Sequence, residues 1–166
     1  GNDHDQQIQR IAAHFNVTPH FFKTVVPDPE VLQWLSSDND DLLKRSLPAL
    51  ENATTPCIFH QRNLQGFHSA SAAYHQLMID IVSRQKRALQ MVLTGSDTSC
   101  IYVDGGFCRN GLFMQLLANA FPSKKVYSVS MIQGTALGAA LALHLHWNKQ
   151  PLPLRLVQLK KWQAYN

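Results

Sequence analysis

The sequence predicts a layered α/β fold, because helical and strand patterns alternate along residues 69–146. Hydrophobic residues recur at three- and four-residue steps in three stretches, and two short β-branched runs separate those stretches. The order helix, strand, helix, strand, helix is typical of helices layered on a sheet. Hydrophobic residues make up 45% of the 166 residues and charged residues 16%, which is enough apolar material for the core of one domain.

The first 69 residues are less regular than the rest. Ile8, Ile11 and Phe15 have helical spacing, and Asn16 and Pro19 follow them as breakers. The elements expected in this region are a helix over 5–14, one or two helical turns over 30–35, a helix over 42–47 capped by the acidic run 37–41, and a short strand over 56–60.

The pattern becomes strong from Ser69 onward. The elements expected there are a long helix over 69–94 with one buried face, a buried strand over 100–103, a helix over 110–120 stopped by Pro122, a strand over 126–129, and a helix over 135–146. The last helix is apolar nearly all round, so we expect it to be buried. The tail over 149–166 alternates leucines like a strand, although two prolines interrupt it.

The segment best suited to bind a ligand is the turn between the strand over 100–103 and the helix after it. Gly105 and Gly106 allow the backbone to turn tightly and to lie flat against a ligand. The start of the next helix presents free N–H groups, which suit a phosphate, and Asn110 can cap that helix or bind a ligand. The spacing fits neither common glycine-rich phosphate motif. By itself, the pattern therefore indicates a tight turn with Asn110 as the N-cap.

A wider set of residues resembles a known family. The motif Asp104-Gly105-Gly106-x-x-x-Asn110-x-x-Phe113-Met114-Gln115, followed by Thr135-Ala136-Leu137-Gly138-Ala139-Ala140, is similar to the C-terminal signature of the FGGY carbohydrate kinases, which include glycerol, xylulose, rhamnulose and fuculose kinases. The similarity is clear over about 70–143. Residues 1–69 match loosely and are assigned to the same kinase by adjacency.

The resemblance implies a fold and a ligand. The fold would be an actin-like ATPase (ribonuclease H-like) domain, the C-terminal half of a two-domain sugar kinase that binds ATP and sugar between its domains. Within this chain, the domain 1–166 would comprise a helical and loop region over 1–69, a nucleotide-binding α/β core over 70–148, and a tail over 149–166. Because the chain opens on Gly1 rather than Met, we expect it to be a piece of a longer protein.

The resemblance also assigns roles to the turn. Gly106 and Asn110 correspond to residues that hold the adenosine part of ATP, and Gly105 and Phe107 line the same loop. Many relatives have a small residue at the position of Phe107, whose ring could pack on the adenine. Gly138 would belong to a buried helix beneath the site, in a structural role.

The catalytic residues of such a kinase are not visible in this sequence. Phosphoryl transfer needs a base, phosphate-binding donors and a carboxylate near Mg²⁺, and none of the eight glycines lies in a D-x-G-T pattern. Asp104 is interpreted as part of the turn, and Asp80 as a residue on the solvated side of its helix. We therefore predict no catalytic residue and no metal ligand in this chain, and no kinase activity from it alone. The alternative is a non-catalytic α/β domain for regulation or protein interaction.

Composition limits the partners. The net charge of +4 is spread thinly, which argues against nucleic acid, and no apolar run approaches the ~20 residues of a membrane span. Three cysteines without a CxxC motif favour a reducing compartment, so a cytoplasmic location is expected. The resemblance implies that the protein binds ATP or ADP, Mg²⁺, and a sugar that is contacted mainly by an N-terminal domain. A homodimer is possible.

Two histidine-containing groups have competing interpretations. Asp3-His4-Asp5 could ligate a metal, but in a polar run it reads as solvated surface. His75 could approach a cleft between domains or form a local hydrogen bond, and we favour the local hydrogen bond.

Overall fold

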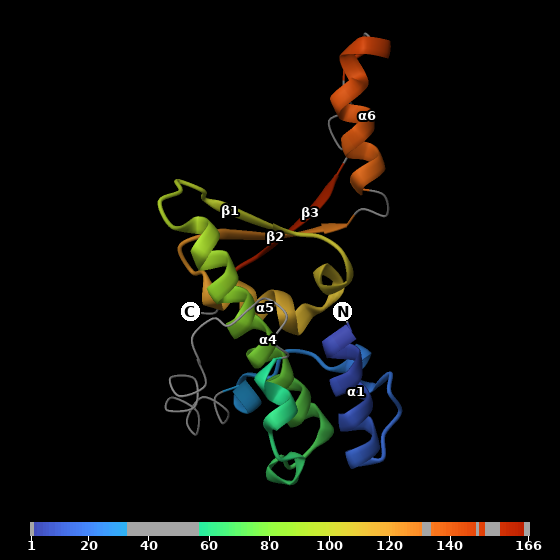
Figure 1. The fold of residues 1–166 in the computed structure, drawn as a ribbon, viewed down its shortest axis with the longest axis vertical. Coiled ribbons are helices and arrows are strands. Elements are labelled where there is room, and N and C mark those ends of the chain that lie inside the picture. The colour runs from blue at the N-terminus through green and yellow to red at the C-terminus, as the bar shows by residue number, and fades with distance from the viewer. Residues whose placement is uncertain (1, 33–56, 131–133, 149, 152–156, 165–166) are drawn as a thin grey trace.

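The computed structural model describes residues 2–32, 57–130, 134–148, 150–151 and 157–164 (Figure 1). Its longer elements are α1 (Asn2–Phe15), α4 (Ala70–Leu93), β1 (Cys100–Val103), α5 (Gly111–Ala120), β2 (Lys125–Ser130), α6 (Gly134–Trp147) and β3 (Gln158–Trp162). Short 3-10 helices lie at Phe21–Thr24, Ile58–Gln61, Leu64–Gly66 and Gly106–Arg109. This mixture of helices around a small sheet confirms the predicted α/β class.

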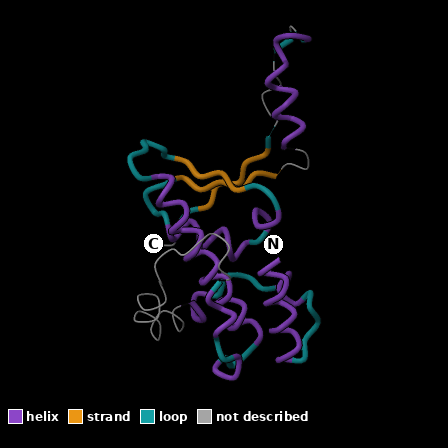
Figure 2. Tube along the Cα trace, in the orientation of Figure 1, coloured by secondary structure: helices purple, strands orange, loops and turns teal. Residues whose placement is uncertain are grey.

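The sheet has three strands in the order β1-β2-β3. β1 and β2 are parallel, with Ile101 opposite Val126, and α5 connects them. β3 runs antiparallel to β2, with Trp162 opposite Val126. Figure 2 shows α4 and α5 on one side of this sheet, and that side faces the core.

The core is built where α4 meets α1, α5 and the sheet. The largest side chains with almost no exposure include Tyr74, Phe59, Ile11, Leu77, Met78, Leu112, Met114, Leu117 and Val126. Ser69 begins α4 as its N-cap, because its hydroxyl accepts a hydrogen bond from the Ala72 amide at 3.1 Å. The buried residues of α4 end at Val82, and Val92 near its C-terminus is 76% exposed. The half of α4 nearer its N-terminus therefore carries the packing that supports the turn after β1.

Most elements expected after Ser69 are confirmed, whereas the strand expected over 56–60 is wrong. Residues Ile58–Gln61 form a 3-10 helix instead. Phe59 is fully buried there, and the Arg10 side chain binds the Phe59 carbonyl oxygen at 3.1 Å. The Phe59 carbonyl oxygen, which in a strand would accept a hydrogen bond from a neighbouring strand, is therefore bonded to a side chain of α1. Residues 29–32 are helical, and the remaining elements expected over 33–56 and the alternation over 152–156 lie outside the described residues.

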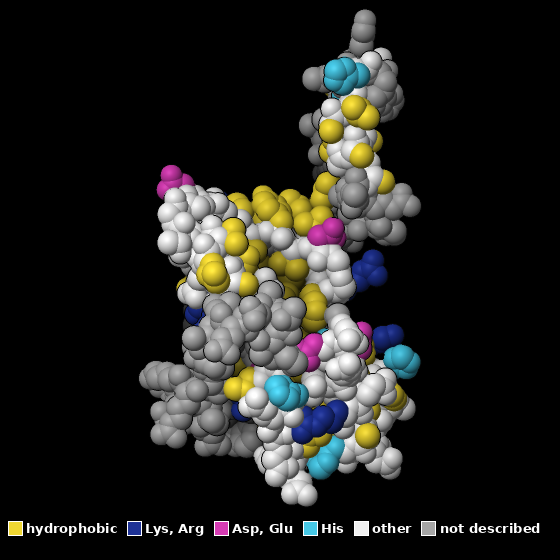
Figure 3. All heavy atoms as spheres, in the orientation of Figure 1, with side chains coloured by type: hydrophobic (Ala, Val, Ile, Leu, Met, Phe, Trp, Pro, Cys, Tyr) yellow, Lys and Arg dark blue, Asp and Glu magenta, His cyan; other side chains and the backbone are white. Residues whose placement is uncertain are grey.

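The expectation that the helix over 135–146 is buried is also wrong. α6 stands apart from the sheet and from the other helices in Figure 1. Leu141 is 37% exposed and Leu143 58%, and among the described residues none outside the adjoining turns of α6 comes within 4 Å of a Cβ added to Gly138. Hydrophobic side chains gather over this helix and over the adjoining side of the sheet (Figure 3). Gly138 therefore does not lie in a buried helix beneath a site in this structure, because no described segment packs on α6 there.

Candidate functional site

The turn after β1 has the geometry that its glycines predict. Gly105 adopts φ 82° and ψ −157°, a region that side chains with a Cβ rarely enter. The Asp104 carboxylate accepts a hydrogen bond from the Gly105 amide at 2.7 Å. Asn110 then caps α5, since its Oδ1 accepts from the Phe113 amide at 3.0 Å. Both the tight turn and the N-cap are as predicted, and Asp104 belongs to the turn.

A pocket of about 460 Å³ opens beside this turn. Its lining residues are His4, Asp5, Phe22, Lys23, Val25, Gly106, Phe107, Arg109, Asn110 and Gly111. Three of the four residues expected from the sequence, Gly106, Phe107 and Asn110, are therefore brought together on one side of it. Gly105 is outside the lining and shapes the turn instead.

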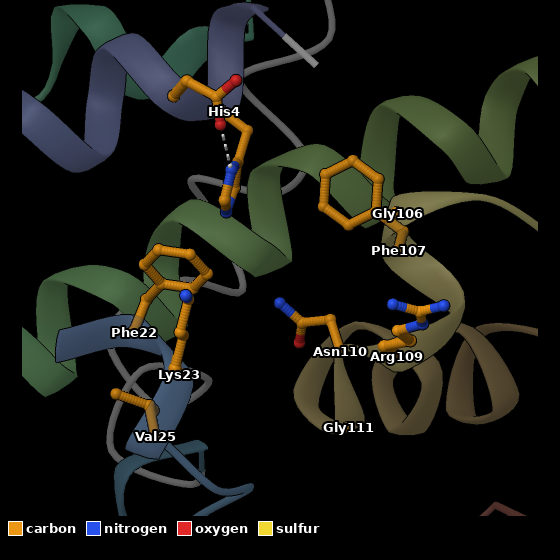
Figure 4. A pocket seen from close by; sticks show the side chains of 10 residues that line it. His4, Phe22, Lys23, Val25, Gly106, Phe107, Arg109, Asn110 and Gly111 are labelled. Atoms are coloured by element: carbon orange, nitrogen blue, oxygen red, sulfur yellow. Dashed lines mark hydrogen bonds and ion pairs between the residues drawn. The ribbon is translucent and has the colours of Figure 1, made fainter. Parts of the chain in front are cut away.

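The other side of the pocket comes from the N-terminal segment, which sequence reasoning missed. Figure 4 shows Phe22, Lys23 and Val25 facing the Gly106–Gly111 side, with His4 above them. The interpretation of Asp3-His4-Asp5 as solvated surface is wrong for two of these residues. His4 is only 8% exposed, and the Asp3 carboxylate accepts a hydrogen bond from the Cys57 amide at 2.8 Å. The helical spacing of Ile8 and Ile11, which are buried in the core, indicates that α1 is packed, but it does not identify the surface on which α1 packs.

Aromatic rings connect the two sides. The His4 ring makes edge contacts with Phe22, at 5.4 Å between centroids, and with Phe107, at 5.3 Å. Phe107 also packs on Phe113 at 4.7 Å. The ring of Phe107 is thereby fixed in a cluster at the edge of the pocket, rather than turned out into solvent.

The charged groups are arranged unevenly around the pocket. Lys23 and Arg109 are exposed cations on opposite walls. Asp5 is the carboxylate of the lining, and its side chain is 74% exposed. Burial lowers the pKa of His4 below the usual 6.5, against a raising effect from the neighbouring Asp5 carboxylate. His4 is therefore neutral at pH 7. Two cations and one carboxylate remain around the pocket, so its net positive charge favours an anionic ligand.

The two walls meet at the hydroxyl of Tyr74, a fully buried residue of α4. The Asn110 Nδ2 group donates a hydrogen bond to the Tyr74 oxygen at 2.6 Å, and His4 Nε2 lies 3.4 Å from the same oxygen. Burial raises the pKa of Tyr74 to about 12, although the bond from Asn110 opposes this. The Tyr74 hydroxyl therefore keeps its proton at neutral pH.

Other candidates from the sequence have structural roles. Asp80 is buried rather than solvated: its carboxylate accepts two hydrogen bonds from Arg62, at 2.7 and 2.8 Å, and one from Gln76 at 2.8 Å. His75 donates to the Ser71 carbonyl at 2.8 Å and accepts from the Asp28 amide at 3.2 Å. The favoured local hydrogen bond of His75 is therefore present.

Within the described ranges, no three or more His, Cys, Asp or Glu side chains are grouped so as to hold a metal ion. Of the helices that the structure describes, none has the length and apolar character needed to cross a membrane.

Comparison with known proteins gives one match. Residues 5–147 match the family model of the FGGY family of carbohydrate kinases, C-terminal domain. No curated protein and no solved structure matches the chain significantly. The matched range includes residues 5–15 of α1, the 3-10 helix Phe21–Thr24 and the turn after β1, whereas His4 on the second wall of the pocket lies just before it.

Proposed function

Because this chain belongs to the FGGY family of carbohydrate kinases through a C-terminal domain, we propose that it is the nucleotide-binding part of an ATP-dependent enzyme that phosphorylates a sugar hydroxyl. The observation that supports this most is the pocket beside the turn after β1. Residues that the family resemblance assigns to adenosine binding line a hollow of about 460 Å³, together with residues 81 to 106 positions earlier in the chain. That volume falls within the roughly 300–1,000 Å³ typical of small-molecule sites.

The lining suits a nucleotide in three respects. Apart from its chain neighbours, no residue that the structure describes comes within 4 Å of a Cβ added to Gly106, so the open side of the turn leaves room for a ligand to lie against the backbone. Phe22 and Phe107 offer apolar ring surface to a planar base. Lys23 and Arg109 supply positive charge for phosphate oxygens, which charge-assisted hydrogen bonds recognise strongly.

ATP would supply the transferred phosphoryl group, and the pocket residues would hold its nucleoside end. Gly106 and Asn110 would contact the adenosine, and Phe107 would border the base. Mg²⁺ is usually held by one or two carboxylates and by the substrate phosphates. Among the described residues only Asp5 brings a carboxylate to the pocket, so we assign no Mg²⁺ ligand and no catalytic step to this chain.

The first test separates the nucleoside and phosphate contributions. Calorimetric titration of the protein with ADP, adenosine and inorganic phosphate should show that ADP binds more tightly than either fragment. Lys23→Ala should weaken ADP by about 3- to 10-fold and leave adenosine unchanged, since a charged hydrogen bond contributes roughly 1 kcal/mol or more. Lys86→Ala, which removes a cation from α4 away from the pocket, is the matched control.

The outcome of the titration separates the two functions. Equal affinity for ADP and adenosine, or an effect of Lys86→Ala as large as that of Lys23→Ala, would contradict the assignment of the cations. Binding of none of the three ligands would favour the alternative, a domain for regulation or protein interaction.

The second test concerns activity. We propose that the chain by itself does not transfer phosphate, because its sequence contains neither a D-x-G-T phosphate loop nor a defensible catalytic base. A coupled ADP-release assay with ATP, Mg²⁺ and a panel of ketoses and polyols should give no turnover above background. Sugar-dependent turnover by this chain, lost in Asn110→Ala, would contradict that proposal.

A further inference from the structure

Tyr74 lies behind the pocket and does not line it, yet both walls are tied to it. It is fully buried on α4, which begins at a well-formed N-cap. Its ring packs against Phe21 and Phe22, both at 5.9 Å between centroids. The position of its hydroxyl is therefore fixed by the core, independently of any ligand.

The contacts of this hydroxyl form one directed chain of hydrogen bonds. The Phe113 amide donates to Asn110 Oδ1 at 3.0 Å, and Asn110 Nδ2 donates to the Tyr74 oxygen at 2.6 Å. Tyr74 can then donate its proton to His4 Nε2 at 3.4 Å, provided that the His4 proton is on Nδ1. That tautomer is the one that also donates from Nδ1 to the Asp5 carboxylate at 3.2 Å. Every member of the chain then has one consistent role.

The chain fixes the orientation of the Asn110 amide. Its oxygen is bound to the start of α5, and one N–H is bound to Tyr74. The same Nδ2 group also lies 3.9 Å from the Met78 sulfur, which is a weak acceptor. Without the Tyr74 oxygen, the amide keeps its bond to the start of α5 and only this weak contact on its nitrogen, so its donor is held less firmly toward a ligand.

We propose that Tyr74 is a positioning residue of the nucleotide pocket: its hydroxyl holds Asn110 on one wall and His4 on the other, and so sets the affinity for the nucleotide. This inference rests on the proposed function. It assigns a role to a residue that touches no ligand, and it predicts that the effect of Tyr74 is transmitted mainly through Asn110.

The test is a double-mutant cycle on ADP affinity with Tyr74→Phe, Asn110→Ala and the double variant. Tyr74→Phe keeps the ring and removes only the hydroxyl. It should weaken ADP binding about tenfold in the wild-type background, the size of one lost hydrogen bond, and at most about 3-fold in the Asn110→Ala background. A merely structural role of Tyr74 would give the same effect in both backgrounds.

Ser128→Ala is the matched control. Ser128 is 8% exposed, and its hydroxyl accepts a hydrogen bond from Trp162 Nε1 at 3.0 Å in the sheet. This substitution also removes one buried hydroxyl and should lower the melting temperature without changing the Kd for ADP. If Ser128→Ala weakens ADP as much as Tyr74→Phe does, the effect reflects general stability and the inference is overturned.

The remaining outcomes are distinguishable. If the wild type binds ADP and Tyr74→Phe does not change the Kd, only the inference about Tyr74 is overturned. If the wild type does not bind ADP, the proposed function is overturned as well. If Tyr74→Phe does not fold, the wild type still provides a test. The side-chain NH₂ of Asn110, assigned by its loss in Asn110→Ala, should contain a proton that is protected from exchange with solvent by its bond to the Tyr74 oxygen. Exchange of both protons at the rate of a free amide would overturn the inference.

Discussion

The clearest quantitative prediction concerns the buried carboxylate of Asp80. Asp80→Ala removes two charge-assisted hydrogen bonds from Arg62 and one from Gln76. The Asp80 side chain is 2% exposed and that of Arg62 16%, so the variant leaves a largely buried guanidinium without its counter-charge. Breaking a buried ion pair in this way costs about 3–5 kcal/mol.

The size of the effect follows from the exposure of Arg62. Because its side chain retains some access to water, we expect the lower end of that range, about 3 kcal/mol of unfolding free energy. This corresponds to a fall in melting temperature of roughly 6–12 °C for a chain of this size. An ion pair on a solvated helix face would contribute at most about 1 kcal/mol, so the two interpretations of Asp80 differ several-fold.

The assay is urea unfolding followed by far-UV circular dichroism, with Asp97→Ala as the matched control. Asp97 is an exposed carboxylate in the turn before β1, and its removal should change the unfolding free energy by less than about 0.5 kcal/mol. A loss below about 1 kcal/mol for Asp80→Ala would refute the reasoning, because it would place Asp80 in solvent.

Three further predictions test the pocket and its surroundings. Burial lowers the pKa of His4 in the folded state, so the unfolded chain takes up this proton at a higher pH than the folded chain does. The folded state is therefore destabilised as the pH falls below about 6.5. Because His4→Gln removes this titration, it should flatten the change in melting temperature between about pH 7.5 and 5.5. An unchanged pH profile in His4→Gln would contradict this. Gly105→Ala should cost about 1–3 kcal/mol because of its positive φ, whereas Gly106→Ala, without positive φ, should cost less than about 1 kcal/mol; equal losses in urea unfolding would contradict the turn geometry. Leu143→Lys should change stability by less than about 0.5 kcal/mol because the side chain is 58% exposed, and a loss above about 1.5 kcal/mol would show that α6 is packed in solution.

The elements from Ser69 onward could be predicted because their signals are local. The three- and four-residue periodicity of α4, the β-branched run of β1 and the glycines after it each lie within a few residues of the element that they define. Asn110 could be recognised as an N-cap for the same reason, since the amide that it caps is three residues away.

The second wall of the pocket could not be predicted in this way. His4 and Lys23 line the same pocket as Asn110 because the N-terminal segment packs on α4. The contact of His4 with Tyr74 joins residues 70 positions apart, which no local pattern encodes. The expectation that Asp80 is solvated is wrong for a similar reason, because its partner Arg62 comes from an irregular segment 18 residues earlier. A helical pattern states which residues share a face, whereas the neighbour of that face depends on the fold.

For α6, the helix itself is predicted correctly but its burial is not. Its sequence is apolar nearly all round, which predicts burial but does not identify the surface that would bury it. Among the described residues no segment covers Leu141 and Leu143, so the same composition appears here as an exposed helix.

The most direct test of the central claim is an amide NMR titration of the protein with ADP. If the pocket between α1 and the turn after β1 holds the nucleotide, the signals of Gly106, Phe107 and Asn110 should shift in a saturable manner together with those of His4 and Lys23. Those of Gly66 and Gly95, which lie outside the pocket lining, should not. Shifts at Gly106 and Asn110 without His4 and Lys23 would remove the N-terminal wall from the site. Saturable binding with no shift at Gly106 or Asn110 would contradict the account.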